Sequence, residues 1–387
     1  MVAVSASPTL DRARALAPVV AAHAGEAEAL RRLPDALAEA FIDARLFQMY
    51  VPEKLGGDEI DYVESLRVFE ELARADGAAG WNVMIGAGNG RYAAAMEPGP
   101  AQEIFGQPRA VWAAAFPVGG RLEGAPGGFR LSGRWPYCSG CQQSTWFLAG
   151  CLVADGDHAR RTADGRPEML VAVLPRKDWR ILETWDTAGM RGTGSHDIVV
   201  EDAFIPTDHT FVLTAPMQSR APLYRIPAFS VLGPGVAAVS LGIARHAIDG
   251  FVALAREKRH AISQTPTQER AVARIRVSEA EGIVRAARAF YYEAVEASWA
   301  LACEDRTPTL EERALLRIAC VTAAQSAARA VDLVFSVSGS SAIQASAPIE
   351  RCWRDVHTAA THATVAEVNF ETTGQVLFGQ DPGPVLL

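Results

Sequence analysis

The sequence predicts an α+β protein in which a helical part, a β part and a second helical part follow one another. Apolar residues recur at helical spacing up to about residue 110, and short alternating runs punctuated by glycines occupy about 111–222. Long alanine-rich stripes at helical spacing fill the remainder. A chain of 387 residues allows two or three domains at about 150 residues each. We expect domains at 1–110, 111–222 and 223–387.

The first part is predicted to contain short amphipathic helices. Apolar residues recur three or four positions apart in two stretches, which the proline- and glycine-rich turn Val51–Gly57 separates. The stretches contain Leu33, Leu37, Ala40 and Ala44, and then Val63, Leu66, Phe69 and Leu72.

The middle part is predicted to be a small antiparallel β-barrel or sandwich, because several short strands follow one another at close spacing. The polar segment Asp155–Arg166 indicates an exposed hairpin loop. The strand-like runs are Trp112–Phe116, Phe129–Leu131, Trp146–Val153, Met169–Leu174 and Asp197–Phe204.

The last part is predicted to be a bundle of long helices with closely packed, alanine-rich faces. Helices of this kind often continue their packing between subunits, so we expect an oligomer. The three stripes are Ile243, Ala247, Phe251 and Leu254; Ile283, Ala287, Phe290, Ala294 and Ser298; and Leu316, Cys320, Ala323, Ala327, Ala330 and Val334.

Composition excludes several classes of protein. Hydrophobic residues make up 49% and charged residues 21%, which is typical of a folded globular chain. The net charge of −8 argues against a broad surface for nucleic acid or anionic membrane. Six cysteines are too few for a disulfide framework. Cys138 and Cys141 lack a second ligand pair, so we expect no metal site.

The sequence also predicts a cytoplasmic protein without a membrane partner. Its start lacks the basic-then-apolar order of a signal peptide. The most apolar stretch, Phe229–Ala244, is shorter than the roughly 18 residues of a membrane-spanning helix and contains Gly233, Pro234 and Gly235.

Several strings, in order along the chain, resemble the acyl-CoA dehydrogenase superfamily. The resemblance implies an N-terminal helical domain, a central β domain, a C-terminal four-helix bundle and a homotetramer. The strings are Leu46–Gly57, Glu70–Trp81, Arg134–Gly140 with Trp146, Gly189–Ser195 followed by Val199–Pro206, and Pro348–Asp355.

One position departs from the dehydrogenases of this superfamily. Many of them place a catalytic glutamate shortly after the Arg-Asp pair, whereas Ala363 stands there in this chain. An alanine cannot abstract a proton. An FAD-dependent acyl-CoA dehydrogenase would therefore need a relocated base, for which Asp249 or Glu367 is the candidate.

Two strings resemble instead the two-component flavin-dependent monooxygenases of the same superfamily: Tyr137–Gly140, and Trp353–His357 with His362. The resemblance implies an oxygenase component that uses reduced FMN or FAD and O2, forming a C4a-hydroperoxyflavin that hydroxylates a small phenolic, indolic or heteroaromatic substrate. A separate NAD(P)H:flavin reductase would supply the flavin. The chain has no Gly-x-Gly-x-x-Gly motif after a strand with which to bind NAD(P)H itself. An amine or amino-sugar N-oxygenase and a non-catalytic relative stay open.

The resemblance assigns the catalytic roles to Ser139, His362 and His357. Ser139 would contact flavin N5, and His362 would act as the base or orient the substrate. His357 and His362 would lie about 140° apart on a regular helix, so both reach one pocket only if the segment bends. Because Trp135, Tyr137 and Ser139 alternate along one strand, we expect them to share a face.

The resemblance also assigns binding residues. The cofactor would contact Trp112, Phe116, Tyr137, Ser139, Ser195, Gly339 and Ser340. The substrate would contact Trp81, Asn89 and His362.

Overall fold

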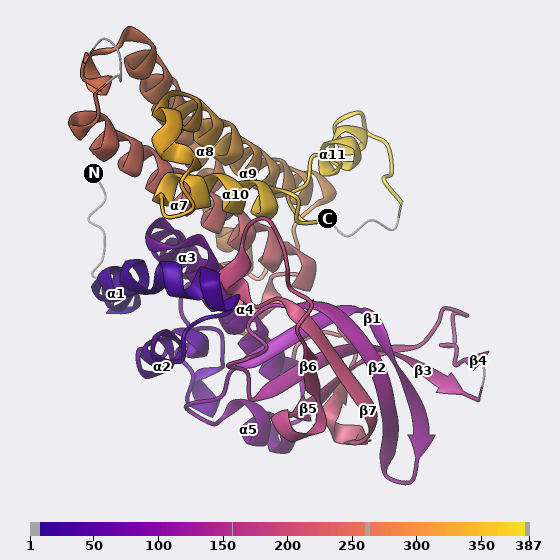
Figure 1. The fold of residues 1–387 in the computed structure, drawn as a ribbon. Helices are drawn as coiled ribbons and strands as arrows, with labels where there is room; N and C mark the ends of the chain where they lie inside the picture. Colours follow the sequence, from indigo (N-terminus) through magenta and orange to yellow (C-terminus); the bar gives the residue numbers. More distant parts are fainter. Residues whose placement is uncertain (1–7, 157, 260–263, 384–387) are drawn as a thin grey trace.

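The computed structural model describes residues 8–156, 158–259 and 264–383 (Figure 1). Helices α1–α5 lie beside the sheet, and the long helices α7–α9 extend away from it on the other side of the molecule (Figure 1). The helical, β and helical elements therefore follow one another as predicted. The boundaries of the three domains stay a prediction.

The N-terminal helices are α1 (Pro8–Leu30), α2 (Asp35–Asp43), α3 (Tyr62–Ala75), α4 (Gly77–Gly90) and α5 (Pro98–Phe105). Aspartates start two of them, because the side chain of Asp61 accepts the Glu64 N–H and that of Asp76 accepts the Ala79 N–H. The extended backbone of Asp76 separates α3 from α4. The predicted apolar stripe of α3 is buried.

The sheet has the order β6-β7-β2-β1-β3-β5-β8, with β4 paired to β3. The prediction of an antiparallel sheet is wrong for one pair: β1 and β3 run parallel. The chain turns back from β1 into β2 and then passes to the other side of β1, so β3 has the direction of β1. The strands are β1 (Trp112–Ala125), β2 (Gly128–Cys138), β3 (Trp146–Asp155), β4 (His158–Ala159), β5 (Met169–Pro175), β6 (Arg180–Leu182), β7 (His196–Pro206) and β8 (Thr210–Phe211).

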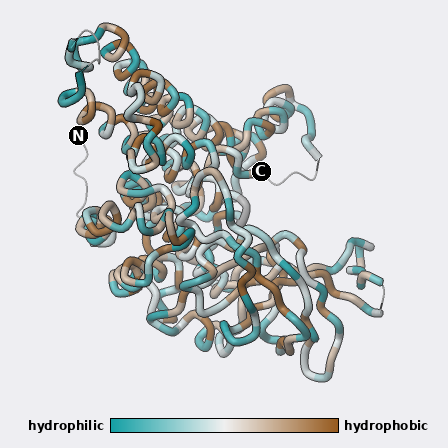
Figure 2. Tube along the Cα trace, in the orientation of Figure 1, coloured by the Kyte–Doolittle hydropathy of each residue, from teal (hydrophilic) through white to brown (hydrophobic). Residues whose placement is uncertain are grey.

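The predicted hairpin after β3 is confirmed. Strand β4 pairs with the end of β3, and the turn that follows is exposed. Figure 2 shows this protruding segment as hydrophilic, whereas the central strands carry hydrophobic stretches.

The C-terminal helices are α6 (Pro222–Arg225), α7 (Ala228–Glu257), α8 (Ala271–Cys303), α9 (Leu310–Ser338), α10 (Pro348–Ala360) and α11 (Asn369–Leu377). Helix α9 packs against α7 and α8, and α10 packs across α7 and α9. The α9 stripe is entirely buried, which confirms its predicted role in the core.

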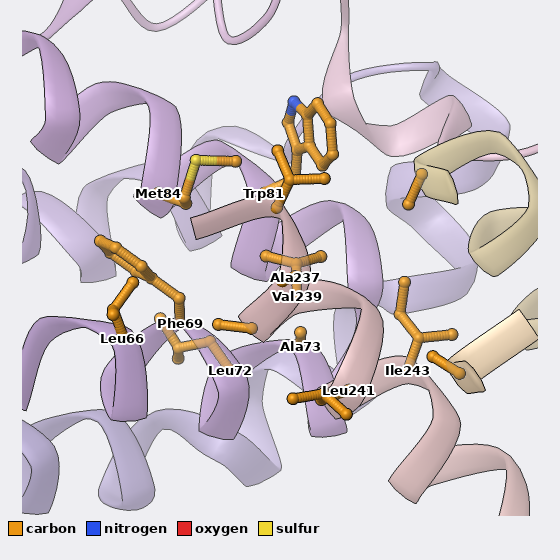
Figure 3. Close-up of a cluster of buried hydrophobic side chains, with 14 of the residues drawn as sticks. Leu66, Phe69, Leu72, Ala73, Trp81, Met84, Ala237, Val239, Leu241 and Ile243 are labelled. Atoms are coloured by element: carbon orange, nitrogen blue, oxygen red, sulfur yellow. The ribbon is translucent and has the colours of Figure 1, made fainter. Parts of the chain in front are cut away.

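The most apolar stretch, Phe229–Ala244, corrects one expectation. It belongs to α7, which could cross a membrane by length and composition alone. Helix α9 meets the same two criteria. In the apolar window of α7, however, 83% of the residues are buried inside the protein. Figure 3 shows that this apolar surface packs inside the protein, where Ala237, Val239 and Leu241 of α7 lie in one hydrophobic cluster with side chains of α3 and α4.

Candidate active site

A row of buried polar side chains lies where α4 meets the ends of two strands. The indole Nε1–H of Trp81 donates to Ser139 Oγ at 3.1 Å, and Ser139 Oγ lies 2.7 Å from Ser195 Oγ. Ser195 Oγ lies 2.7 Å from Thr193 Oγ1, which donates to the Met190 carbonyl at 2.8 Å. We call Trp81, Ser139, Ser195 and Thr193 the hydroxyl row.

The direction of every hydrogen bond in the hydroxyl row follows from its last member. A hydroxyl has one proton and two lone pairs, and the Thr193 proton is used by the Met190 carbonyl. Ser195 must therefore donate to Thr193, and Ser139 must donate to Ser195. Since Ser139 also accepts the Trp81 N–H, its hydroxyl keeps one unused lone pair. Ser139 can thus offer an acceptor to a ligand that brings an N–H.

Two loops hold the hydroxyl row in place. The N–H of Gly140 donates to the Thr193 carbonyl at 2.9 Å, and the Cys141 thiol donates to the Gly194 carbonyl at 3.3 Å. Gly194 has φ +57°, and Gly140 has φ +71°, the left-handed region that favours glycine. The turn after β2 and the turn before β7 are therefore joined at the point where both carry a serine.

Helix α10 fixes the second loop from its other side. The N–H of Met190 donates to Asp355 Oδ1 at 2.5 Å, and Met190 adopts φ +54°. Burial and the neighbouring Asp76 raise the pKa of Asp355 to about 7. Arg354 does not pair with Asp355: it binds Glu28 at 2.5 Å and the Ala188 carbonyl at 2.6 Å.

His362 lies beside the hydroxyl row, just after the end of α10. The rings of Trp81 and His362 meet edge to face with centroids 5.5 Å apart. In Figure 3 the indole nitrogen of Trp81 lies on the side away from the α7 residues, and this nitrogen bonds Ser139. Trp81, Ser139, Ser195 and His362, which were predicted separately, are thus brought together.

The hydrogen bonds of His362 set its tautomer. Its Nδ1 accepts the Thr364 N–H at 3.3 Å and lies 2.9 Å from Thr364 Oγ1. The ring proton of the neutral imidazole is therefore on Nε2. Burial, with a smaller effect of Arg317, lowers the pKa of His362 to about 4. At neutral pH this residue presents an N–H donor rather than a free ring lone pair.

Tyr137 corrects the expectation that three alternating side chains share one face. Trp135 is fully buried, whereas Tyr137 is 72% exposed with φ +62°. The pairing of β2 with β7 shifts between Trp135 and Cys138, and this irregularity breaks the alternation. Tyr137 meets Trp185 edge to face with centroids 6.2 Å apart. The pair leaves an exposed aromatic surface next to Ser139.

Three predicted contact residues are engaged in packing. The side chain of Asn89 donates to the Trp112 carbonyl at 2.9 Å, and Trp112 is buried and stacked on Phe105. Phe116 packs on Tyr92 with centroids 4.9 Å apart. These contacts give the three side chains a structural role, and the ligand contacts expected of them stay predictions.

Three further predicted residues lie apart from the hydroxyl row. His357 is inside α10 and bonds Asp332 at 3.0 Å on the protein surface. Gly339 follows the end of α9 with φ +63°, and Ser340 beside it is exposed. The cofactor contact expected of Gly339 and Ser340 stays a prediction.

The two carboxylates considered for a relocated base have other surroundings. Asp249 pairs with Arg74 at 2.9 Å and with Arg245 at 2.8 Å. Glu367 is exposed, as is Ala363 at the position of the missing glutamate. Neither carboxylate has a contact with the hydroxyl row among the described residues.

Sequence reasoning missed Thr193, Trp185 and Met190. Thr193 lies inside the quoted string Gly189–Ser195, and a hydroxyl two residues before Ser195 was the available signal. Met190 lies inside the same string, but no local signal marked its role or that of Trp185, because their contacts depend on how β2, β7 and α10 meet.

Comparison with known proteins identifies the family. Residues 10–97 match the acyl-CoA dehydrogenase N-terminal domain and residues 234–367 match the acyl-CoA dehydrogenase C-terminal domain. The chain is 32% identical over 364 residues to the indole-3-acetate monooxygenase of Pseudomonas putida, covering 94% of this chain and 92% of the relative. It is 31% identical over 366 residues to the flavin-dependent monooxygenase oxygenase subunit HsaA of Rhodococcus jostii RHA1, covering 92% and 94%.

A solved structure has the same fold. XiaF from Streptomyces, in complex with FADH2 and glycerol, superimposes with a TM-score of 0.90 at 28% identity, over 98% of this chain and 97% of that one. The chain therefore belongs to the acyl-CoA dehydrogenase superfamily and, within it, to the oxygenase components of flavin-dependent monooxygenases.

Proposed function

We propose that this protein is the oxygenase component of a two-component monooxygenase that hydroxylates a small aromatic substrate with reduced flavin and O2. The observation that carries the proposal is the unused lone pair of Ser139 at the end of the hydroxyl row, beside Trp81 and His362. The reduced flavin ring carries an N–H at N5, which is the kind of donor that Ser139 can accept. The relatives named above include an indole-3-acetate monooxygenase and an oxygenase subunit.

The residues present fit a reduced flavin. The exposed ring of Tyr137 and the half-buried ring of Trp185 provide aromatic surface for a flat ring, and Ser139, which bonds Ser195, lies near Tyr137 in the chain. Bound flavin would supply the activation of O2. Ser139 would hold the N5 proton in place, which a flavin must keep for oxygen transfer. The FADH2 complex of XiaF supports reduced FAD, and reduced FMN is the other candidate.

The substrate is proposed to lie between Trp81 and His362. Trp81 offers an aromatic ring, and His362 offers an Nε2–H donor to a substrate oxygen or ring π-system. His362 would thereby orient the substrate. The helices that surround this point would keep water out, as oxygen transfer requires.

The partners follow from the same proposal. A separate NAD(P)H:flavin reductase would supply reduced flavin, as the term oxygenase subunit implies for the Rhodococcus relative. We propose a homotetramer in the cytoplasm, without nucleic-acid or membrane partners. The tetramer is supported by exposed apolar side chains around α11, among them Leu377 at 72% and Phe378 at 82% exposure.

The test is an anaerobic titration of the protein with reduced FAD and reduced FMN, followed by mixing with oxygen. We expect tight binding of one reduced flavin and a delay before the oxidised flavin spectrum returns. With an aromatic substrate, product should replace hydrogen peroxide. Tightly bound oxidised FAD that an acyl-CoA reduces would instead identify a dehydrogenase with a relocated base, and no flavin binding would identify a non-catalytic relative.

A further inference from the structure

A small cleft between α7 and α9 has a cationic lining and lies near Thr364, the residue that bonds His362. Its empty space, which includes open solvent, is about 210 Å³. Two of its lining residues are arginines one helical turn apart on α9, and none is acidic. The residues that line it are Ser230, Gly233, Pro234, Arg313, Leu316, Arg317 and Cys320.

The cleft adjoins the proposed substrate position. Arg317 donates to the Thr364 carbonyl at 3.2 Å, and Thr364 is the residue that bonds His362. A Cβ added to Gly233 would lie 3.7 Å from Cβ of Thr364, so the Gly233 backbone of the cleft lies near the same residue. The charge of Arg317 contributes to the lowered pKa of His362, which indicates that the potential of the cleft reaches the imidazole.

The two arginines have different surroundings. Arg317 is 7% exposed and also bonds Asn369 Oδ1 at 3.2 Å, so it is held within the fold. Arg313 is half-buried, and its Nε is buried without a hydrogen-bond partner among the described residues. The nearby Glu312 is used elsewhere, because it closes the capping box of Thr309.

Arg313 also lies near the N-terminus of α9, which is the positive end of the helix dipole. It lies in the first turn of α9, where the unpaired N–H groups add a partial positive charge that Glu311 and Glu312 of the same turn oppose. A buried guanidinium N–H without a partner costs free energy, which an anion in the cleft would recover. A carboxylate matches this site because it accepts hydrogen bonds from a guanidinium in fork geometry and is small.

We infer that the cleft binds a carboxylate carried by the aromatic substrate, with Arg313 as its main partner. This inference rests on the proposed function. The ring would lie at Trp81 and His362, and the acidic side arm would extend past Thr364 to Arg313. The enzyme would thus prefer aromatic acids over neutral aromatics of the same ring.

The test compares indole-3-acetate with 3-methylindole, which has the same ring system but no carboxylate. Both are titrated anaerobically into the complex of the oxygenase with reduced FAD. We expect the acid to bind roughly tenfold to hundredfold more tightly, as a charge-assisted hydrogen bond of this kind provides. Arg313→Gln should remove this preference and leave the affinity for 3-methylindole unchanged, while Arg313→Lys should keep part of it.

The matched control is Arg329→Gln, which removes an arginine from the exposed far part of the same helix, where it pairs with Glu279. This variant should bind both compounds like the wild type. Equal affinity of the wild-type complex for acid and neutral compound, binding of neither, or an equal loss for both in Arg313→Gln would overturn the inference. Failure to bind reduced FAD, measured before either compound is added, would overturn the proposed function instead.

Discussion

Replacement of His362 by asparagine separates two roles for this residue, the general base and the orienting donor. A pKa displaced from 6.5 to about 4 corresponds to about 3 kcal/mol that disfavours the imidazolium. A base with such a low pKa is poorly matched to work near pH 7, whereas a neutral N–H donor is unaffected. Because Nδ1 already accepts from Thr364, we expect the donor role.

The two roles predict different magnitudes. Loss of one neutral hydrogen bond is worth about 0.5–1.5 kcal/mol, so His362→Asn should lower the rate of hydroxylation roughly two- to tenfold. Loss of a general base would lower it by about 10²–10⁴. The assay is a single turnover with reduced flavin, oxygen and substrate, in which product and hydrogen peroxide are quantified between pH 5 and pH 9.

The pH profile provides a second criterion. For the donor role the contribution of His362 is constant between pH 5 and pH 9, because the imidazole is neutral above a pKa of about 4 and keeps its Nε2–H. His357→Asn is the control and should leave the profile unchanged, because His357 lies on the surface with Asp332. A loss of a hundredfold or more, or an inflection near pH 6.5 that disappears in His362→Asn, would refute this reasoning.

Three further changes test the scaffold. Ser139→Ala leaves the buried Trp81 N–H without its acceptor, so we expect about 1–3 kcal/mol lower stability in urea unfolding and weaker binding of reduced flavin. Asp355 has a pKa raised from 3.8 to about 7, so its folded form holds a proton that the unfolded form releases, and its contribution to stability falls as pH rises from about 4 to 7. The difference in unfolding free energy between Asp355→Asn and the wild type should therefore favour the variant more at pH 8 than at pH 5. A difference that favours the variant more at pH 5 would contradict this reasoning. Asn89→Ala removes the donor to the Trp112 carbonyl and should cost about 1 kcal/mol of stability while leaving substrate affinity unchanged; weaker substrate binding would support the substrate contact that the resemblance assigns to Asn89.

The element types could be predicted because they depend on local patterns, and several site residues could be predicted from the family resemblance. The stripes at helical spacing identified the core faces of α3 and α9, and the strings around Ser139 and Ser195 identified two serines of the site. The contact between these serines could not be predicted, since it requires two turns from separate strands to meet. The hydrogen bond from Gly140 to Thr193 is a tertiary contact without a sequence signature.

The wrong expectation about the β2 side chains has a physical origin. Strict alternation placed Trp135 and Tyr137 on one face, but a shift in strand pairing turned Tyr137 outward. The ligand contacts that the resemblance assigns to Trp112 and Asn89 stay predictions, although both side chains are engaged in packing. For His357 and His362, the predicted arrangement depended on whether one regular helix contains both residues. Helix α10 ends at Ala360, so only His357 obeys helical geometry.

The end of α10 also explains how the string Pro348–Asp355, which resembles that of the acyl-CoA dehydrogenases, can occur in a monooxygenase. Within the helix, Asp355 holds the N–H of Met190 and Arg354 holds Glu28 and the Ala188 carbonyl, so both residues support the loop that carries Ser195. After the helix, Ala363 is exposed and His362 turns to Trp81. The scaffold and the reacting groups thus lie on opposite sides of one helix end. A change of residue after that end can alter the chemistry without disturbing the loop, which is why the residues beyond Ala360 are more informative about the reaction than the helix before it.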